Sequence, residues 1–425
     1  MLRIKDVRAV VASNLVNCEI VIEGEKIKEI KRTLAKSNEE HVISGKGLIA
    51  IPGIIDTHAH ILDPVIPASN FTNASEMALT GGVTSVLEMP TNRVTLSKHA
   101  IIEKIENARK NSIIDFGVHA GNMEKSFYGR IQEIKGLVKG IKGFLCAPYQ
   151  LPDLDGFLSE ASVNGIIPML HCEDEEVLQK LKTEGSWDKI LPENYPFLRP
   201  PNAERAAVEK AINAAQKLGV NLHIVHLSSK EGFSVVERNR NGKITVEVCP
   251  HHLIFTRKDL EKKGAFLKMN PPLREKEDIN VLWDGLISGK IDFVATDHFY
   301  ATYEEKEKNF IDAPAGIPSL EALLPLVYTF GVEKRGMPLE RMVEVLSTKQ
   351  ASVFGLVNKG EIREGKDADI VFLNPHKKRK FVSKFWSPYE GMELNGYPEI
   401  VLLRGRVVME NGQMYEKPGY GRMLY

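Results

Sequence analysis

Apolar residues recur through the middle of the chain in short runs that alternate with segments of helical periodicity. Buried strands of a parallel sheet show such runs, because crossover helices cover both faces of the sheet. We predict eight strands in this region, at residues 48–56, 83–90, 113–119, 141–146, 166–171, 221–226, 244–250 and 291–297. Eight parallel strands are the number that closes a TIM barrel.

Three of the intervening segments carry helix signals. Residues 97–110, 202–219 and 277–289 place apolar side chains at helical spacing. In the second of these we expect Asn202 to cap the amino end after Pro201, and Gly219 to end the helix. The pattern therefore predicts helices that cross over between consecutive strands.

In the two end segments of the chain, apolar and polar residues alternate as in short β-strands, with turns between the strands. They comprise residues 1–50 and 359–425, on either side of the central segment 51–358. Because both end segments lie outside the barrel segment and both show this strand-like alternation, we expect them to pack together. We therefore predict an α/β protein: a (β/α)8 TIM barrel at 51–358 with a small discontinuous β-sandwich domain formed by the two ends.

Composition and charge exclude several classes of protein. The 425 residues carry 56 basic and 56 acidic side chains. Such a balance argues against a nucleic-acid or membrane-surface binder, and no apolar run reaches the roughly 18 residues that span a membrane. The four cysteines lie far apart, which argues against a disulfide scaffold and a thiolate zinc cluster. We expect a cytoplasmic protein.

Several predicted strands end in residues of the metal-binding types. His58 and His60 follow the first strand, His171 and His226 end the fifth and sixth, and Asp297 ends the eighth. The carboxyl ends of barrel strands meet at one face, where barrel enzymes place their active sites. Each residue alone is more often an ordinary buried or exposed side chain, but their convergence predicts a metal centre. Nitrogen and oxygen ligands without sulfur suit zinc.

Lys142, within the fourth predicted strand, is the unusual member of this set. Desolvating an ammonium in an apolar strand costs several kcal/mol unless the group is paired or chemically altered. Its position therefore indicates a special role at the same face.

Lys142 is accompanied by the motifs PGIIDTHAH (52–60), HCED (171–174), HLSS (226–229) and ATDH (295–298). With these motifs the chain resembles the amidohydrolase superfamily, in its cyclic-amidase branch of dihydroorotases, allantoinases and hydantoinases. The segments EVCPHHL (247–253), KMNPPLREKED (268–278) and FIDAPAGIPSLEALLPL (310–326) are most similar to class I dihydroorotases. RPPNAE (199–204) and WSPYEGMEL (386–394) are equally similar to allantoinases.

The resemblance implies an enzyme with two divalent metal ions, which we expect to be zinc. The implied ligands are His58, His60 and Asp297 for the first ion, and His171 and His226 for the second. Lys142, carboxylated at Nζ, would bridge both ions. A hydroxide bridging the metals would attack the ring carbonyl, with Asp297 as general acid and base. The partners implied are a small cyclic amide as substrate and further copies of the chain, in a dimer or a tetramer.

The groups that hold the substrate carboxylate in dihydroorotases are replaced in this chain. The family has an Arg two residues after the His-x-His pair, an Asn after the Met-Pro of the second strand and a His four residues after the strand-eight Asp. Leu62, Thr91 and Ala301 stand at these positions, with Asn92 and Arg93 beside the second. A buried carboxylate without charge-assisted partners loses on the order of several kcal/mol of binding. Arg93 could supply the missing guanidinium.

The resemblance also implies the residues that contact the substrate. They are Leu62, Asn92, Asn270, Ala301, Ala315 and Gly316. Tyr149 has the type of a hydantoinase oxyanion donor, but its spacing from Lys142 differs from the hydantoinase pattern. We therefore predict a packing or surface role for Tyr149.

Three hypotheses on function stay open. The first is a dihydroorotase-like hydrolase of pyrimidine biosynthesis. The second is an allantoinase or a hydantoinase (dihydropyrimidinase), acting on a ring without the orotate carboxylate. The third is a non-catalytic dihydroorotase-like scaffold subunit, which the presence of every implied metal ligand disfavours.

Overall fold

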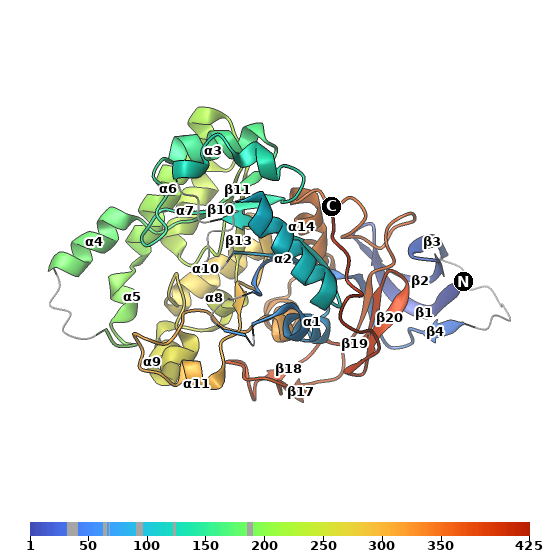
Figure 1. Cartoon of the computed structure of the whole chain (residues 1–425). Helices are drawn as coiled ribbons and strands as arrows, with labels where there is room; N and C mark the ends of the chain where they lie inside the picture. The colour runs from blue at the N-terminus through green and yellow to red at the C-terminus, as the bar shows by residue number, and fades with distance from the viewer. Residues whose placement is uncertain (32–40, 63–65, 68, 91–96, 122–124, 185–189) are drawn as a thin grey trace.

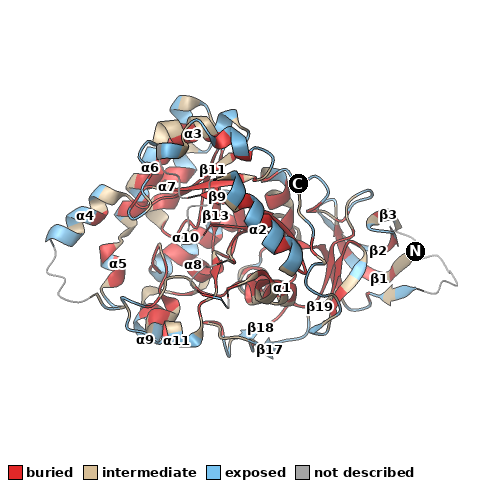
Figure 2. Cartoon of the chain, in the orientation of Figure 1, coloured by how far each residue is buried: buried red, intermediate tan, exposed pale blue. Residues whose placement is uncertain are grey.

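The chain is a mixed α/β protein in which helices surround the strands of the middle of the chain, while a sheet that includes β1, β2 and β20 lies at the right-hand end (Figure 1). The computed structural model describes residues 1–31, 41–62, 66–67, 69–90, 97–121, 125–184 and 190–425. Buried residues concentrate in the strands and on the inner sides of the helices, whereas the outer sides of α2, α3 and α4 are exposed (Figure 2).

Two parallel sheets occupy the middle of the chain, in the orders β15-β6-β7-β8 and β14-β13-β12-β11-β10-β9. Each of the eight predicted strand regions contains at least one strand. The strands are β6 (Ile54–His60), β7 (Val83–Glu88), β8 (Asp115–Val118), β9 (Ala120–Gly121), β10 (Gly140–Phe144), β11 (Ile167–His171), β12 (Leu222–Ile224), β13 (Ile244–Val248), β14 (Phe293–Val294) and β15 (His298–Phe299).

Chain continuity joins these two sheets at both edges. β8 pairs with β7 and β9 with β10, although only His119 separates β8 from β9. In the same way β14 pairs with β13 and β15 with β6, with residues 295–297 between them. The third and eighth predicted regions contain β8 and β14, and β9 and β15, which follow directly, pair into the other sheet.

Helices connect the parallel strands, and four more helices, α11 to α14, follow the last of these strands. They are α1 (Phe71–Thr80), α2 (Lys98–Asn111), α3 (Leu154–Val163), α4 (Glu175–Glu184), α5 (Tyr195–Leu198), α6 (Pro201–Leu218), α7 (Lys230–Asn239), α8 (Pro250–Ile254), α9 (Arg257–Lys263), α10 (Lys276–Ile287), α11 (Tyr303–Lys306), α12 (Leu323–Val327), α13 (Leu339–Val343) and α14 (Lys349–Val353). The three predicted helices correspond to α2, α6 and α10. Within α2, Ile101, Ile105 and Ala108 form the buried stripe that helical spacing predicts.

The predicted caps of α6 are half right. Gly219 ends the helix in the left-handed conformation, with φ +67°, as expected. The prediction of Asn202 as the amino-terminal cap is wrong, because the cap is Pro200 and the helix begins at Pro201. A proline is favoured in the first helical position, where its fixed φ suits the helix and its missing N–H has no partner to lose.

The two ends of the chain form one sheet of nine strands. Its order is β21-β20-β19-β16-β5-β1-β2-β3, with β4 paired to β1. The strands are β1 (Leu2–Val11), β2 (Asn14–Glu23), β3 (Lys26–Lys31), β4 (Val42–Ser44), β5 (Ile49–Pro52), β16 (Ile370–Asn374), β19 (Tyr397–Leu403), β20 (Arg406–Glu410) and β21 (Gln413–Met414). β17 (Arg379–Lys380) and β18 (Glu393–Leu394) pair separately. Because β5 pairs with β16, the amino-terminal and carboxyl-terminal segments join directly.

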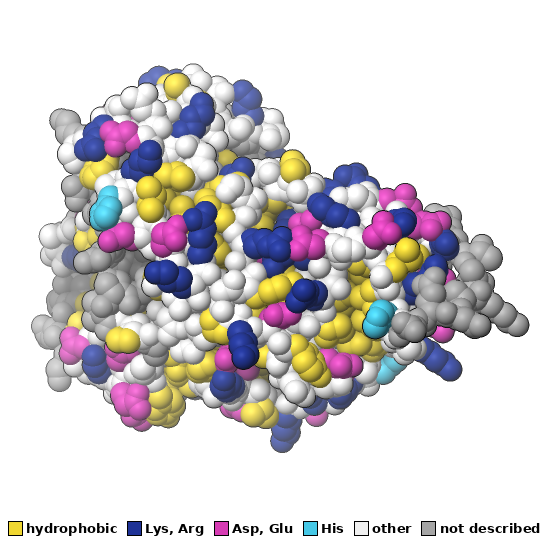
Figure 3. Space-filling view, turned by 45° about the vertical axis from the view of Figure 1, so that its right-hand side comes forward, with side chains coloured by type: hydrophobic (Ala, Val, Ile, Leu, Met, Phe, Trp, Pro, Cys, Tyr) yellow, Lys and Arg dark blue, Asp and Glu magenta, His cyan; other side chains and the backbone are white. Residues whose placement is uncertain are grey.

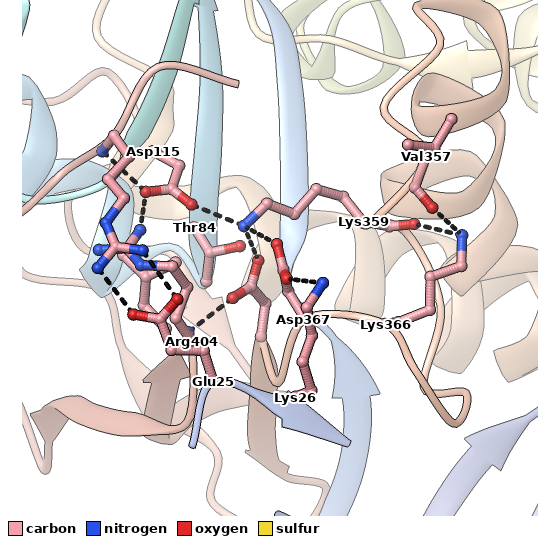
Figure 4. Close-up of polar contacts among 12 residues, drawn as sticks. Glu25, Lys26, Thr84, Asp115, Val357, Lys359, Lys366, Asp367 and Arg404 are labelled. Carbon is pink, nitrogen blue, oxygen red and sulfur yellow. Dashed lines mark hydrogen bonds and ion pairs between the residues drawn. The ribbon is translucent and has the colours of Figure 1, made fainter. Parts of the chain in front are cut away.

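A buried ion network ties this sheet to β8 (Figure 4). Nζ of Lys359 lies 2.6 Å from Asp115, 2.7 Å from Asp369 and 2.9 Å from Asp367. Arg404 donates to Asp115 from its guanidinium and to Asp369 from its backbone N–H. Buried charges are tolerated only when each is paired, so these contacts specify how β8 and the sheet of the chain ends pack together.

Acidic and basic side chains are interspersed over the face drawn in Figure 3. This distribution agrees with the balanced charge of the sequence. Among the described residues, no helix has the length and apolar character needed to cross a bilayer.

Candidate metal centre and substrate cavity

The side chains predicted to bind metal come together at the carboxyl ends of the parallel strands. They are His58 and His60 in β6, Lys142 in β10, His171 at the end of β11, His226 two residues after β12, and Asp297 between β14 and β15. All but His58 line one cavity of about 350 Å³. The parallel arrangement explains the meeting, because it directs every strand toward the same edge.

The first predicted ligand group converges on one oxygen. Nε2 of His58 and Nε2 of His60 each lie 3.2 Å from Oδ1 of Asp297. Ligand atoms of the three residues lie within 4.8 Å of one another. Nε2 of His58 has no hydrogen-bond partner among the described residues. The geometry and the chemistry of the donor set therefore fit one divalent cation.

The second predicted group is a pair of imidazoles. Nδ1 of His171 lies 3.0 Å from Nε2 of His226. Burial lowers the pKa of both rings and favours their neutral forms. Two neutral imidazole lone pairs repel at this distance unless a proton or a cation lies between them. The pair therefore fits a second cation.

Lys142 is almost completely buried at this centre. Its exposed fraction is 1%. Nζ lies 5.3 Å from the centre of the Phe144 ring. Burial lowers the pKa of Lys142 to about 8. The amine is therefore more easily deprotonated than an exposed lysine, and the neutral amine is the form that reacts with carbon dioxide.

The backbone turns sharply where two of these residues leave their strands. His226 has φ +40° and Asp297 has φ +47°, in the left-handed region that costs most residues energy. Next to Asp297, the backbone N–H and the hydroxyl of Thr296 both donate to buried Asp56. Asp56 thus holds the turn that aims Asp297 at the two histidines of β6.

Glu247 of β13 is a site residue that the sequence patterns did not reveal. Its side chain is fully buried, and Oε1 lies 2.5 Å from Nδ1 of His58. Oε2 lies 3.1 Å from Nε2 of His223. By accepting from Nδ1, the carboxylate leaves the lone pair of Nε2 of His58 directed at the first ligand group. A buried acid inside the apolar run ITVEVCP was the available signal.

Glu173 orients a histidine of the second predicted ligand group, as Glu247 orients His58 in the first. Its Oε2 lies 2.7 Å from Nε2 of His171, so that Nδ1 faces His226. Arg199, which also lines the cavity, lies with its Nε 3.0 Å from Oε1 of Glu173. The guanidinium offsets the cost of burying this carboxylate.

Some of the residues predicted to contact the substrate line the cavity, and others do not. Its lining comprises His60, Pro90, Lys142, Phe144, Cys146, Ala147, Pro148, Tyr149, His171, Arg199, His226, Asn270, Asp297, Phe299, Pro314, Ala315 and Gly316. Asn270, Ala315 and Gly316 belong to this lining. Leu62 and Ala301 are outside this lining; the carbonyl of buried Ala301 accepts from Nε1 of Trp386 at 2.6 Å. Asn92, with its neighbours Thr91 and Arg93, lies outside the described residues.

Tyr149 lines the cavity, and its ring packs against Phe144 with 5.6 Å between the ring centres, as the predicted packing role requires. A local turn brings it to the cavity. The backbone N–H of Leu151 donates to the carbonyl of Phe144 at 2.8 Å, which closes residues 145–150 into a turn after β10. Spacing along the chain does not report such a turn.

Comparison with known proteins places this geometry in context. Residues 49–408 match the model of the Amidohydrolase family. A dihydroorotase from Methanosarcina mazei is 32% identical, with 100% of this chain and 97% of the relative covered. An allantoinase from Rubrobacter xylanophilus is 32% identical, with 90% and 88% covered. The crystal structure of a dihydropyrimidinase from Brevibacillus agri superposes with a TM-score of 0.90 at 28% identity, covering 99% of this chain and 98% of that one.

Proposed function

The chain belongs to the amidohydrolase family, and we propose that it is a metal-dependent hydrolase that opens a cyclic amide by breaking a ring C–N bond. The observation that carries this proposal is the convergence of three histidines, a lysine and an aspartate at one cavity, with a fourth histidine, His58, beside Asp297. The cavity volume of about 350 Å³ suits a small ring. Similarity to dihydroorotases over the whole chain makes dihydroorotate the first substrate to test.

The residues present fit two divalent cations, which we propose to be zinc. His58, His60 and Asp297 would hold one, and His171 and His226 the other. Lys142, carboxylated on Nζ, would contribute an anionic group between them. Carboxylation joins the neutral amine to carbon dioxide and releases one proton, and the lowered pKa of Lys142 favours it. The carbamate also removes the buried ammonium.

Bound cations of this kind polarise a carbonyl and supply a hydroxide nucleophile near neutral pH. The chain itself would supply the proton transfers and the orientation of the ring. Asp297 would take the proton of the nucleophile and deliver it to the ring nitrogen as the C–N bond breaks. Asn270 and the backbone at Ala315 and Gly316 would hold the ring amide, since all three line the cavity. Tyr149 lines the cavity, and its hydroxyl would donate toward the carbonyl oxygen.

We also propose that the parallel strands form a closed (β/α)8 barrel over residues 51–358. The support is that β8–β9 and β14–β15 each join both sheets, so that the strand order returns to its start. Segments 1–50 and 359–425 would form the second domain, which we propose to be a β-sandwich. The pairing of β5 with β16 supports a domain made from both ends.

A second candidate function has its own observation. In the described part of the cavity lining, the cationic side chains are Lys142 and Arg199, and Arg199 is paired with Glu173. Leu62 and Ala301 bring no cation to replace the dihydroorotase anchors. This favours a ring without a carboxylate, as an allantoinase or a hydantoinase would open.

The deciding experiment is hydrolysis of dihydroorotate, allantoin, hydantoin and dihydrouracil by the zinc-loaded protein, followed by loss of ring absorbance and by product mass. We expect turnover of dihydroorotate. Turnover of the neutral rings alone would move the assignment to the allantoinase or hydantoinase class. A protein that binds no metal and opens none of the rings would instead support the scaffold hypothesis.

Glu247→Gln is expected to lower affinity for the first cation by about 10–100-fold, because the amide no longer fixes the tautomer of His58 as a carboxylate does. Competition with a chromogenic zinc chelator measures this loss. Glu237→Gln, which changes an exposed ion pair with Lys290, is the matched control. Equal zinc affinity in both variants would exclude this role for Glu247.

Cytoplasmic location and assembly into a dimer or a tetramer stay predictions. Four buried cysteines without disulfides support a reducing location. Light scattering of the purified protein tests the assembly.

A further inference from the structure

One wall of the substrate cavity is formed by the segment after α11. Pro314, Ala315 and Gly316 line the cavity. The backbone N–H of Phe299 donates to the carbonyl of Ile317 at 3.0 Å, which ties this wall to β15. Gly316 has φ +108°, and a Cβ there would lie 2.7 Å from Cβ of Phe299. The wall therefore packs closely, and its backbone position sets the shape of the cavity.

Lys268 binds the backbone at the start of this segment, at residues 310–313. Its exposed fraction is 9%, and Nζ donates to the carbonyls of Phe310, Ile311 and Ala313 at 2.7, 2.8 and 2.8 Å. An ammonium has three N–H donors, so all of them are used on one segment. The backbone carbonyl of Lys268 also accepts from the N–H of Gly316 at 2.9 Å.

Lys306 of α11 holds the wall itself. Its exposed fraction is 1%, and Nζ donates to the carbonyls of Pro314 and Ala265 at 2.8 and 3.0 Å. Nζ also lies 5.8 Å from the centre of the Trp386 ring. Among the described residues, neither Lys306 nor Lys268 forms an ion pair with a carboxylate.

The two ammonium groups are held in this place at a cost. Burial lowers the pKa of Lys268, and burial together with the nearby charge of Lys268 lowers the pKa of Lys306 to about 7. An apolar side chain of similar size would avoid that cost, but it would leave the bound backbone carbonyls without donors. The two lysines therefore act on the position of this backbone through its carbonyls.

We propose that Lys268 and Lys306 are positioning residues that hold the substrate-facing wall by binding five backbone carbonyls, four of them in the segment 310–314. The inference rests on the proposed function, because the wall is assigned there to the ring substrate. Neither lysine lines the cavity or contacts a predicted metal ligand. Their effect is therefore on substrate binding, through the wall, and not on the metal centre.

The test uses Lys268→Met and Lys306→Met in the full metal-loaded chain, with the ring that the unaltered protein opens. We expect KM to rise about tenfold for either variant, while kcat stays within about threefold, since a charge-assisted network of this kind is lost. Zinc per chain is expected to stay unchanged. Lys263→Met is the matched control, because its Nζ donates to the carbonyl of Pro388 at 2.6 Å and not to the wall. Lys306→Gln, which keeps two N–H donors, is expected to recover most of the KM.

Hydrogen exchange supplies a readout that needs no turnover. Without substrate, peptides covering residues 307–317 are expected to exchange faster in both Met variants than in the unaltered protein and in Lys263→Met. If no ring is opened at all, the proposed function fails while this result can still hold. Unchanged KM and exchange together with a lower Tm would show a role in stability alone and overturn the proposal. A loss of zinc or of kcat would overturn it too, since it would place the lysines in the metal centre.

Discussion

Asp297→Asn is expected to lower kcat/KM for ring opening by about 10⁴-fold, because the variant loses both the proton carrier and an anionic metal ligand. The fold is expected to survive. Asparagine has the same shape as aspartate and tolerates the left-handed backbone that Asp297 adopts, with φ +47°. The contacts of Thr296 with Asp56, which hold the turn, are untouched. Steady-state kinetics and zinc content measure the two losses separately.

The matched control is Asp155→Asn, which changes a surface ion pair with Lys217 away from the cavity. It is expected to keep normal kinetics and both zinc ions. If Asp297→Asn opened the ring at the unaltered rate, another group would have to move the proton, and the assignment of Asp297 as general acid and base would be wrong.

Lys142→Met is expected to separate activity from stability. Loss of the anionic group between the two predicted cation sites is expected to lower kcat/KM by about 10⁴-fold and zinc to less than two ions per chain. In the metal-free protein at neutral pH, the same change is expected to leave Tm equal or higher, because it removes an ammonium that is 1% exposed and has a lowered pKa. Kinetics, zinc analysis and calorimetry give the three values.

The sign of this stability effect follows from the pKa. Burial moves the pKa of Lys142 from its ordinary value of 10.5 down to about 8. The penalty for holding the ammonium is therefore complete below about pH 8 and fades as pH rises toward 10.5, so the advantage of Met in Tm is expected to shrink over that interval. Added acetate is expected to restore part of the activity of Lys142→Ala, since it brings back a carboxylate. A variant that kept full activity without it would exclude a bridging role for Lys142.

Local patterns predicted the strands and helices well, because the spacing of buried apolar residues over a few positions differs between a strand and a helix. The apolar runs located all eight regions of parallel strand, and helical spacing located α2, α6 and α10. The start of α6 was misplaced since two favourable signals, a polar cap and a proline in the first turn, competed at neighbouring positions. The pairing of β9 and β15 into a different sheet from β8 and β14, which they directly follow, depends on which neighbours meet, and periodicity does not contain that information.

The sequence by itself determined which chemistry this protein carries. Ligand-type residues stand at the ends of separate apolar runs, and a parallel sheet has to bring such ends to one edge, so His58, His171 and Asp297 were predictable as neighbours. Only the tertiary structure decided what surrounds them. Glu247 contacts His58 across 189 positions of sequence, and Lys268 binds carbonyls 42 to 45 positions away. Such contacts depend on how side chains pack after the strands have met, and no local pattern encodes that packing.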